Sequence, residues 1–408
     1  MEKKKYISSI VLIWLAWAIL LIGFQQVVVA RFALQPPDYA LNWTPSETTP
    51  SNVSKRPNLH EPFLNTQAAW DSEYYISMAL KGYNDPTIEA IPDLEHTSQR
   101  ISLSYAFMPL YSLMMKGLAY LLKVFGLNDR ATVVLAGVII SLIGALAGMF
   151  GIFELTLDKW GEEGGLRAAF YLLIFPSGFF LAQVYTEGLF IGLTFGCLAL
   201  LHRRKWLWAG LLAAISIWAR PGGGLILIAP MLLVWLMDRT WIMDPKIAYG
   251  RLAAVAAPLF SYIIWTQTSL ANHFWQVEDR YFSRGLLLVN RSYFQWRACF
   301  SSIFSGQNSQ AAVYYAIEFG TIILALMCIL LSLKDAPELA LYSLGVLVFS
   351  MTSGSPQGMV RYLLAAPCIF FILAGWGRSR VFDRAWSVAS LLLMGMLVTL
   401  FSFNFWVA

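Results

Sequence analysis

The stretch AWDSEYYISMALKGY, residues 69–83, lies in the first long polar segment of an otherwise apolar chain. Asp71 is a favourable N-cap, apolar residues recur at helical spacing from Tyr75 to Leu80, and Gly82 is a favourable C-terminal stop. The stretch therefore predicts a short amphipathic helix that begins at Asp71. Two roles are open for Asp71: a simple helix cap beside the membrane, or a catalytic carboxylate held at the membrane surface.

The composition around this stretch is that of an integral membrane protein. Hydrophobic residues make up 58% of the chain and charged residues 13%, and the mean hydropathy is +0.59. Apolar runs of roughly 17–25 residues are long enough to cross the hydrocarbon core of a bilayer as helices. The net charge of +5 comes mainly from short loops, which is typical of a topology signal and argues against a nucleic-acid partner. The four cysteines and four histidines are scattered, so we predict no disulfide framework, no metal site and no cofactor.

The first apolar run, residues 7–30, follows a cluster of lysines and is longer than the core of a typical signal peptide. It predicts a first transmembrane helix with the lysines in the cytoplasm, so that the next segment lies outside. Residues 101–127 are ambiguous, because they are apolar enough to span but contain Pro109 and two lysines. Placing this stretch in the outer interface keeps most loop cations inside, which the positive-inside rule favours.

The expected fold is an all-α polytopic membrane protein with about eleven transmembrane helices and a large first extracytoplasmic loop carrying amphipathic juxtamembrane helices. The predicted organisation is a module over 1–268 with its outer loop at 32–130, an outer loop at 269–310, and C-terminal transmembrane helices over 311–408. The expected spans after the first are 131–156, 166–183, 187–202, 206–220, 222–238, 247–268, 311–333, 338–352, 362–376 and 384–406.

On this topology several charged residues gather on the outer face, where cations should be scarce. Arginine at a loop edge often only extends to lipid headgroups, but its planar fork is also well suited to a phosphate. Charged residues near membrane helices are candidates for function. The set is Asp71, Glu73, Glu187, Arg220, Asp279, Arg280, Arg291 and Arg361.

Two further stretches have both a structural and a functional interpretation. In FPSGFFLAQVYTE, residues 175–187, Pro176 can bend a span, and Thr186 can cap the next helix with Glu187 in its first turn. In RPGGG, residues 220–224, the glycines suit either a simple helix–helix turn or a backbone opening for a ligand. No nucleotide-binding loop, HExxH or nucleophile elbow is present, which argues against a primary pump.

Taken together, these stretches resemble the GT-C superfamily of glycosyltransferases that use polyprenyl-phosphate sugars. Trp70-Asp71 with the tyrosines up to Tyr83 resembles the WD-x-x-x-Y…GY motif of the PIG-V family, which includes the eukaryotic enzyme that adds the second mannose to glycosylphosphatidylinositol anchors. Residues 105–111 resemble its F-x-P-L-Y segment, and residues 175–187 its FPS…YTE segment. Arg220-Pro221 and Arg361-Tyr362 resemble two further elements in the expected order.

The resemblance implies transfer of mannose from polyprenyl-phosphate-mannose to a hydroxyl of an extracytoplasmic lipid or glycan, with inversion. Asp71 is the expected general base, and Arg361 and Arg220 are expected to bind the donor phosphate. Partners are then the lipid-linked donor, the acceptor and membrane lipids. The remaining residues expected to bind substrate are Trp70, Tyr74, Tyr75, Tyr105, Tyr111, Tyr185, Glu187 and Tyr362.

Two other classes of function remain open from the sequence. A lipid-linked sugar flippase or small-solute transporter would use a similar number of helices, but should place charges near the bilayer midplane and often shows repeated halves. A structural subunit of a membrane complex would need no catalytic carboxylate. The chain is compact and shows no eukaryotic retention signal, so we expect a prokaryotic plasma membrane, or the endoplasmic reticulum if the source is eukaryotic.

Overall fold

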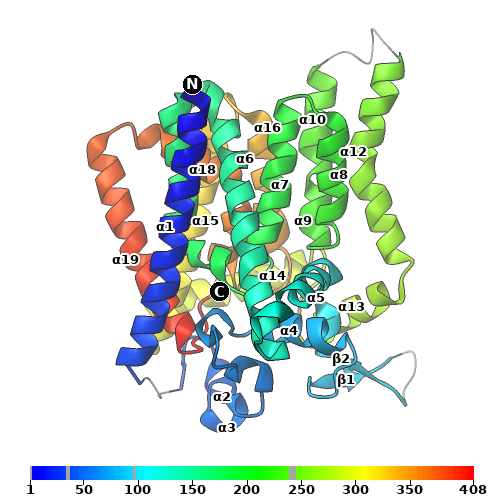
Figure 1. Ribbon diagram of the computed structural model, residues 1–408, viewed down its shortest axis with the longest axis vertical. Helices are drawn as coiled ribbons and strands as arrows, with labels where there is room; N and C mark the ends of the chain where they lie inside the picture. Colours follow the sequence, from blue (N-terminus) through cyan, green and yellow to red (C-terminus); the bar gives the residue numbers. More distant parts are fainter. Residues whose placement is uncertain (1, 34–36, 95–97, 239–244) are drawn as a thin grey trace.

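The computed structural model describes residues 2–33, 37–94, 98–238 and 245–408. Its long helices run side by side, with shorter elements gathered at one end (Figure 1). The bundle comprises α1 (Glu2–Arg31), α6 (Asp129–Ile174), α7 (Glu187–His202), α8 (Trp206–Ser216), α9 (Pro221–Ile226), α10 (Ile228–Met237), α12 (Pro245–Thr266), α15 (Ser309–Ser332), α16 (Pro337–Met351), α17 (Met359–Tyr362), α18 (Pro367–Trp376) and α19 (Arg380–Ser402).

The shorter elements come from the polar segments between these helices. Strands β1 and β2 form a two-stranded antiparallel sheet in which Ile91 faces Ile101. The elements are α2 (Thr44–Glu47), α3 (Pro50–Val53), α4 (Ser72–Lys81), β1 (Ala90–Pro92), β2 (Arg100–Ser102), α5 (Pro109–Leu122), α13 (Ser269–Arg280) and α14 (Val289–Phe304).

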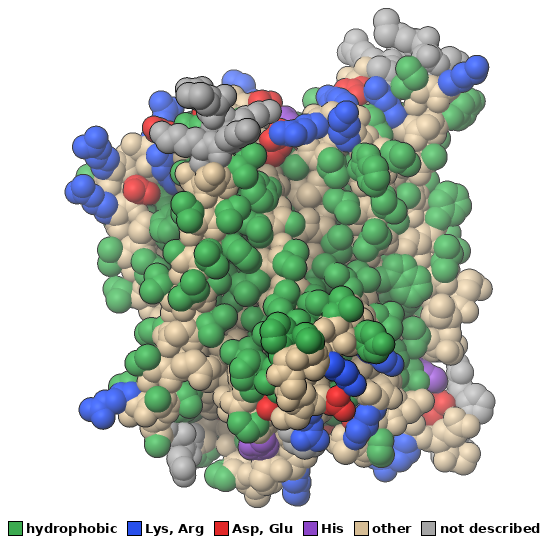
Figure 2. Space-filling view, viewed as in Figure 1, with side chains coloured by type: hydrophobic (Ala, Val, Ile, Leu, Met, Phe, Trp, Pro, Cys, Tyr) green, Lys and Arg blue, Asp and Glu red, His purple; other side chains and the backbone are tan. Residues whose placement is uncertain are grey.

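The surface confirms that this is an integral membrane protein. Apolar side chains form a broad band over the middle of the molecule, and Lys and Arg gather towards its two ends (Figure 2). Among the described residues five helices are long and apolar enough to cross a membrane, or six if the bent pair Met359–Ala365 and Pro367–Trp376 is one span. The all-α membrane class is therefore confirmed. Several other predicted spans are helices of only 10–17 residues, so the count of eleven spans stays a prediction.

Of the predicted spans 131–156 and 166–183, the second needs correction. Helix α6 covers the whole of 131–156, is interrupted by non-helical backbone at Gly161, and ends at Ile174, before the predicted end of the second span. Phe175 is extended because Pro176 disfavours helical backbone in the residue before it. A 3-10 helix, Gly178–Ala182, and a short bend then lead to α7. The second half of the predicted span is thus irregular backbone, and it carries Tyr185 to the site.

Loops that were expected in the cytoplasm are joined to one another at the end of the bundle where α1 begins (Figure 1). Lys159 of α6 contacts Asp335 at 2.9 Å, just before α16. Arg204, between α7 and α8, contacts Asp238 at 2.7 Å, and Arg251 of α12 contacts the same carboxylate at 2.9 Å. These ion pairs place the α6, α7–α8, α10 and α15–α16 turns at one end, in agreement with the positive-inside assignment.

The opposite end carries the elements of the polar segments, among them α4, α5 and α13 (Figure 1). Helix α5 has 14 residues and is therefore about 21 Å long, shorter than the hydrocarbon core of a bilayer. Its surface nevertheless exposes large apolar side chains such as Leu113 and Tyr120. This combination supports the prediction that residues 101–127 lie in the outer interface.

Close packing of α6 against α7 fixes the position of the first residues of α7. A Cβ atom added at Gly144 would lie 2.4 Å from the backbone of Gly188, and one added at Gly188 would lie 2.2 Å from the Ser141 carbonyl oxygen. Small residues at this spacing let two membrane helices approach until their backbones touch. The contact occurs one residue after Glu187, so it places the start of α7 firmly against the middle of the bundle.

Candidate active site

The helix that carries Asp71 forms as predicted, but Asp71 does not cap it. Helix α4 begins at Ser72 and ends before Gly82, and Tyr75, Ile76 and Ala79 on its apolar stripe are buried. The Asp71 carboxylate makes no capping hydrogen bond. It accepts instead a hydrogen bond from the Arg361 guanidinium, with 2.7 Å between Nη1 and Oδ2. The simple cap is therefore the wrong interpretation of this residue.

The backbone before Asp71 is held in an unusual conformation by two contacts. Trp70 has a left-handed φ of +53°, which a large side chain adopts only when its surroundings hold it there. Its indole Nε1 donates to the Phe405 carbonyl at 3.2 Å. The Tyr185 hydroxyl donates to the Ala69 carbonyl at 3.0 Å and accepts from the Asp71 amide at 3.3 Å. Trp70 and Tyr185 thus fix the turn that presents the carboxylate.

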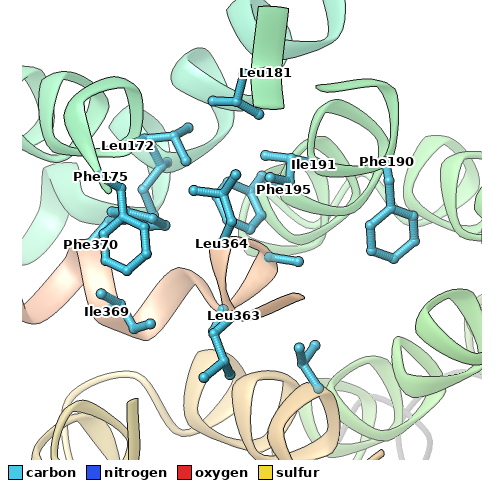
Figure 3. Close-up of a cluster of buried hydrophobic side chains, with 14 of the residues drawn as sticks. Leu172, Phe175, Leu181, Phe190, Ile191, Phe195, Leu363, Leu364, Ile369 and Phe370 are labelled. Atoms are coloured by element: carbon cyan, nitrogen blue, oxygen red, sulfur yellow. The ribbon is translucent and has the colours of Figure 1, made fainter. Parts of the chain in front are cut away.

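Arg361 is positioned by a turn rather than by a long helix. Gly358, with φ +84°, opens the four-residue helix α17, and the Ser177 hydroxyl donates to the Val360 carbonyl at 2.6 Å. Leu363 and Leu364, which follow directly, are fully buried among aromatic and aliphatic side chains of α6, α7 and α18 (Figure 3). The Arg361 side chain is only 5% exposed, so the packed core beside it restricts its position.

Glu187 and Arg220 form the second charged pair of the site. The Glu187 side chain is 2% exposed and bonds the Arg220 guanidinium, while Arg361 Nε lies 3.4 Å from the same carboxylate oxygen. Arg220 Nε also donates to the Thr186 hydroxyl at 3.0 Å. Thr186 makes no capping hydrogen bond to α7, so the predicted cap is wrong and its hydroxyl orients Arg220 instead.

A third arginine enters from the segment between α13 and α14. Arg284 donates to the Tyr362 hydroxyl and, at 3.3 Å, to the Gln357 carbonyl. The same Tyr362 hydroxyl accepts from Arg361 at 3.3 Å. The Tyr362 ring lies 5.2–5.8 Å from the guanidinium carbons of Arg220, Arg284 and Arg361, close enough for cation–π attraction. Tyr362 therefore gathers three cations at one point.

Two carboxylate oxygens in this cluster are left without a protein donor among the described residues. Asp71 Oδ2 is engaged by Arg361, whereas nothing described donates to Oδ1, and the side chain is 20% exposed. Glu187 Oε2 is buried and has no partner. A buried polar atom without a partner costs about 1–3 kcal/mol, so such atoms mark places where ligand hydroxyls can bind. The cluster can accept hydroxyl protons and stabilise an anion at the same time.

The predicted aromatic residues divide into two groups. Tyr185 and Tyr362 contact the charged cluster, Trp70 holds the turn before Asp71 through its bond to Phe405, and the Tyr75 hydroxyl lies 3.5 Å from that of Thr186. The structure places the other three elsewhere. Tyr74 stacks on Phe107, Tyr105 bonds Asn84 and stacks on Tyr83, and the fully buried Tyr111 donates to the Gly137 carbonyl.

Four charged residues predicted on the outer face do not join the cluster. Glu73 is buried and faces Arg56 at 3.7 Å, and burial raises its pKa to about 7. Arg280 donates to the Pro92 carbonyl at 2.6 Å. Arg291 lies 3.9 Å from Asp279, and both of these side chains are exposed. Their positions agree with structural or surface roles.

Three residues that shape the site were not predicted from the sequence. Arg284 and Glu278 lie in the segment 269–310, for which no motif was matched. Burial raises the pKa of Glu278 to about 7, the Asp71 charge adds to that rise, and Arg284 opposes it. Glu318 of α15 is fully buried and accepts the amides of Gly358 and Val360 at 2.8 and 2.9 Å. A lone Glu inside an apolar run was a signal for function that could have been followed.

Within the described ranges, no group of three or more His, Cys, Asp or Glu side chains could hold a metal ion. The prediction that the protein needs no metal remains untested.

Comparison with known proteins identifies one family and one curated relative. The family model described as "Mannosyltransferase (PIG-V)" matches residues 10–271, more than half of the chain. GPI alpha-1,6-mannosyltransferase 2 of Mus musculus is 27% identical over 201 residues, which are 48% of this chain and 37% of that protein. The match thus spans little more than a third of the length of the relative.

Two solved structures are similar in overall arrangement. ArnT from Cupriavidus metallidurans, bound to undecaprenyl phosphate, has a TM-score of 0.45 at 11% identity, over 86% of this chain and 74% of that one. The archaeal oligosaccharyltransferase AglB from Archaeoglobus fulgidus, in complex with an inhibitory peptide and a dolichol-phosphate, has a TM-score of 0.45 at 12% identity, over 99% of this chain and 55% of that one.

Proposed function

Because the chain belongs to the PIG-V family of mannosyltransferases, we propose that it transfers mannose at the outer end of the bundle. The donor is polyprenyl-phosphate-mannose, and the acceptor is a hydroxyl of an extracytoplasmic lipid or glycan. The observation that carries the proposal is the pair formed by Asp71 and Arg361, with no donor from the described residues to Asp71 Oδ1 and 20% of the side chain exposed.

The reaction needs a base on one side of the sugar and a stabilised leaving group on the other. Asp71 Oδ1 accepts the proton of the acceptor hydroxyl while the oxygen attacks the anomeric carbon of mannose. The bond from that carbon to the phosphate oxygen breaks, and its electron pair leaves with the polyprenyl phosphate. Attack from the side opposite the phosphate inverts the anomeric centre.

Arg361 then has two tasks. Its bond to Asp71 Oδ2 orients the carboxylate so that Oδ1 faces the acceptor. Its charge, with that of Arg220, stabilises the negative charge that develops on the departing phosphate. Glu187, whose Oε2 has no hydrogen-bond partner in the described part of the chain, accepts a hydrogen bond from a hydroxyl of the sugar or acceptor. Trp70, Tyr75, Tyr185 and Tyr362 supply the aromatic surroundings of the same site.

The remaining predicted substrate contacts, Tyr74, Tyr105 and Tyr111, are proposed as supports for α4 and its neighbours rather than as ligands. They pack against aromatic or backbone groups of this layer. For localisation we propose the plasma membrane of a prokaryote with the site facing outwards, or the endoplasmic reticulum in a eukaryote.

A transfer assay tests the proposal. Purified protein in nanodiscs is mixed with radiolabelled polyprenyl-phosphate-mannose and a lipid extract from its host. We expect wild type to move label into a new product with inverted anomeric configuration and Asp71→Asn to fail. Asp279→Asn is the matched control, because that carboxylate is exposed and its arginine contact is 3.9 Å long.

Two results would count against the proposal. Equal turnover by wild type and Asp71→Asn would show that Asp71 is not the general base. Facilitated movement of a lipid-linked sugar across vesicles, with no transfer from any sugar donor, would favour the transporter instead.

A further inference from the structure

We propose that Arg284, in the segment between α13 and α14, is the principal ligand of the donor's lipid-linked phosphate. The inference rests on the proposed function and adds a residue that neither the motifs nor the family match at 10–271 includes. The ligand class is a phosphate carried on a prenyl chain. Four features of the molecule support the assignment.

The first is the balance of charge. Arg361 is paired with Asp71, and Arg220 with Glu187. Arg284 is different, because no carboxylate of the described residues lies within ion-pair distance: Glu278 attracts it only at longer range, and its side chain donates to the Tyr362 hydroxyl and the Gln357 carbonyl. Both of these acceptors are neutral. The charge of Arg284 is therefore the one in this cluster that a phosphate can neutralise without first breaking an ion pair.

The second feature is the direction of attack. In an inverting transfer the base and the phosphate lie on opposite sides of the anomeric carbon. Arg361 bonds directly to Asp71, so its charge is divided between the base and the phosphate. Among the described residues Arg284 forms no hydrogen bond or ion pair with Asp71, and it is joined to Arg361 through the Tyr362 hydroxyl, which accepts from both arginines. With its acceptor positions occupied, that hydroxyl keeps its own proton to donate to a phosphate oxygen.

The third feature is the way the segment is held. Ser283 and Leu287 both have left-handed backbone, with φ of +58° and +50°. The Gly285 amide donates to the Ser353 carbonyl at 2.9 Å, and the Leu288 amide to the Thr352 carbonyl at 2.8 Å. Non-glycine residues keep such backbone only where the surrounding structure imposes it, commonly at ligand sites. Arg284 is thus held against the turn that leads to Tyr362.

The fourth feature is the surface beside Arg284, which is apolar. Leu286 and Leu287 are 47% and 63% exposed, and Tyr293 and Phe294 on α14 are exposed as well. In a membrane protein such a surface faces lipid, and large aromatic residues are enriched at the interface. A cation between this surface and the Asp71 site suits a phosphate that arrives on a lipid chain rather than one dissolved in water.

The test is equilibrium binding of tritiated farnesyl phosphate to the purified protein in nanodiscs of zwitterionic lipid. We expect Arg284→Gln to weaken binding on the order of 10- to 100-fold, as for loss of charge-assisted hydrogen bonds. Arg284→Lys keeps the charge and should retain most of the affinity. Arg291→Gln, which removes a nearby exposed cation, is the matched control and should bind like wild type.

Each alternative result overturns a stated part of the inference. If Arg284→Gln binds farnesyl phosphate with wild-type affinity, or if Arg220→Gln loses more affinity than Arg284→Gln, Arg284 is not the principal ligand of the phosphate. Competition by inorganic phosphate as strong as that by unlabelled farnesyl phosphate would exclude a lipid-specific site. An equal loss in the Lys variant, with a lowered unfolding temperature in both variants, would mean that Arg284 only holds the fold.

Binding is read without any transfer, so this test is separate from that of the proposed function. If Asp71→Asn transfers mannose like wild type while Arg284→Gln loses binding of farnesyl phosphate, the assignment of Asp71 as the base is wrong and the assignment of Arg284 as the phosphate ligand is supported. If Arg284→Gln binds normally while Asp71→Asn is inactive, the reverse holds.

Discussion

Replacing Glu318 tests how the site is held, because this residue bonds the backbone of the turn that carries Arg361, residues 358–362, here called the arginine turn. Glu318 lies on α15, is fully buried, and accepts the amides of Gly358 and Val360 at 2.8 and 2.9 Å. The Arg361 amide in turn donates to the Gly358 carbonyl at 3.1 Å. The carboxylate therefore fixes the backbone on which Arg361 stands, and through Arg361 it fixes Asp71.

The magnitude follows from these contacts. Glu318→Ala removes two charge-assisted acceptors: it leaves the buried Val360 N–H unpaired, at about 1–3 kcal/mol, and leaves the Gly358 N–H with only its 3.2 Å bond to the Tyr314 hydroxyl, at about 1 kcal/mol, so unfolding should become easier by about 2–4 kcal/mol. Glu318→Gln keeps the shape but points an NH₂ group at one of the two amides, which should cost about 1–3 kcal/mol. Transfer should fall roughly tenfold in the Gln variant, because Arg361 no longer holds Asp71 in one orientation.

Unfolding in detergent micelles by titration with dodecyl sulfate measures the stability, and the radiolabel assay measures transfer. Asp335→Asn is the control, since its contact with Lys159 is partly exposed and such pairs contribute about 0–1 kcal/mol. Wild-type stability and wild-type transfer in Glu318→Gln would refute the role of this residue as the support of the arginine turn.

Two further predictions concern pH and helix packing. Burial raises the pKa of Glu73 in the folded state from 4.5 to about 7, so between these pH values the folded state keeps a proton that the unfolded state has lost. The free energy of unfolding should therefore rise as the pH falls from 8 to 5. Glu73→Gln should flatten that rise in thermal unfolding curves. Gly144→Ala should destabilise by about 1–3 kcal/mol because its Cβ would strike the Gly188 backbone, whereas Gly250→Ala, with open space around it, should unfold like wild type.

The sequence predicted the membrane class and the helix at Asp71 because both depend on local patterns. Apolar run length is set by the bilayer, and the stripe from Tyr75 to Leu80 follows the helical period. It also predicted that Asp71, Glu187, Arg220 and Arg361 gather on the outer face, and the ion pairs between them show that these four side chains lie together.

What escaped prediction depends on contacts between distant parts of the chain. Asp71 fits the pattern of a cap, but an arginine 290 positions away takes its carboxylate instead. Pro176 is a local signal for the end of α6 at Ile174, but the 3-10 turn that replaces the rest of the predicted span 166–183 is held by distant contacts such as the Ser177 bond to Val360. Arg284 had no motif around it, and its importance comes from Tyr362, which no local pattern could place beside it.

The most direct test of the central claim is a single-turnover measurement with donor bound before the acceptor is added. If Asp71 is the general base, Asp71→Asn should bind farnesyl phosphate like wild type but transfer mannose on the order of 10²–10⁴-fold more slowly, while Asp279→Asn transfers normally. A single-turnover rate for Asp71→Asn within a few-fold of wild type would contradict the account.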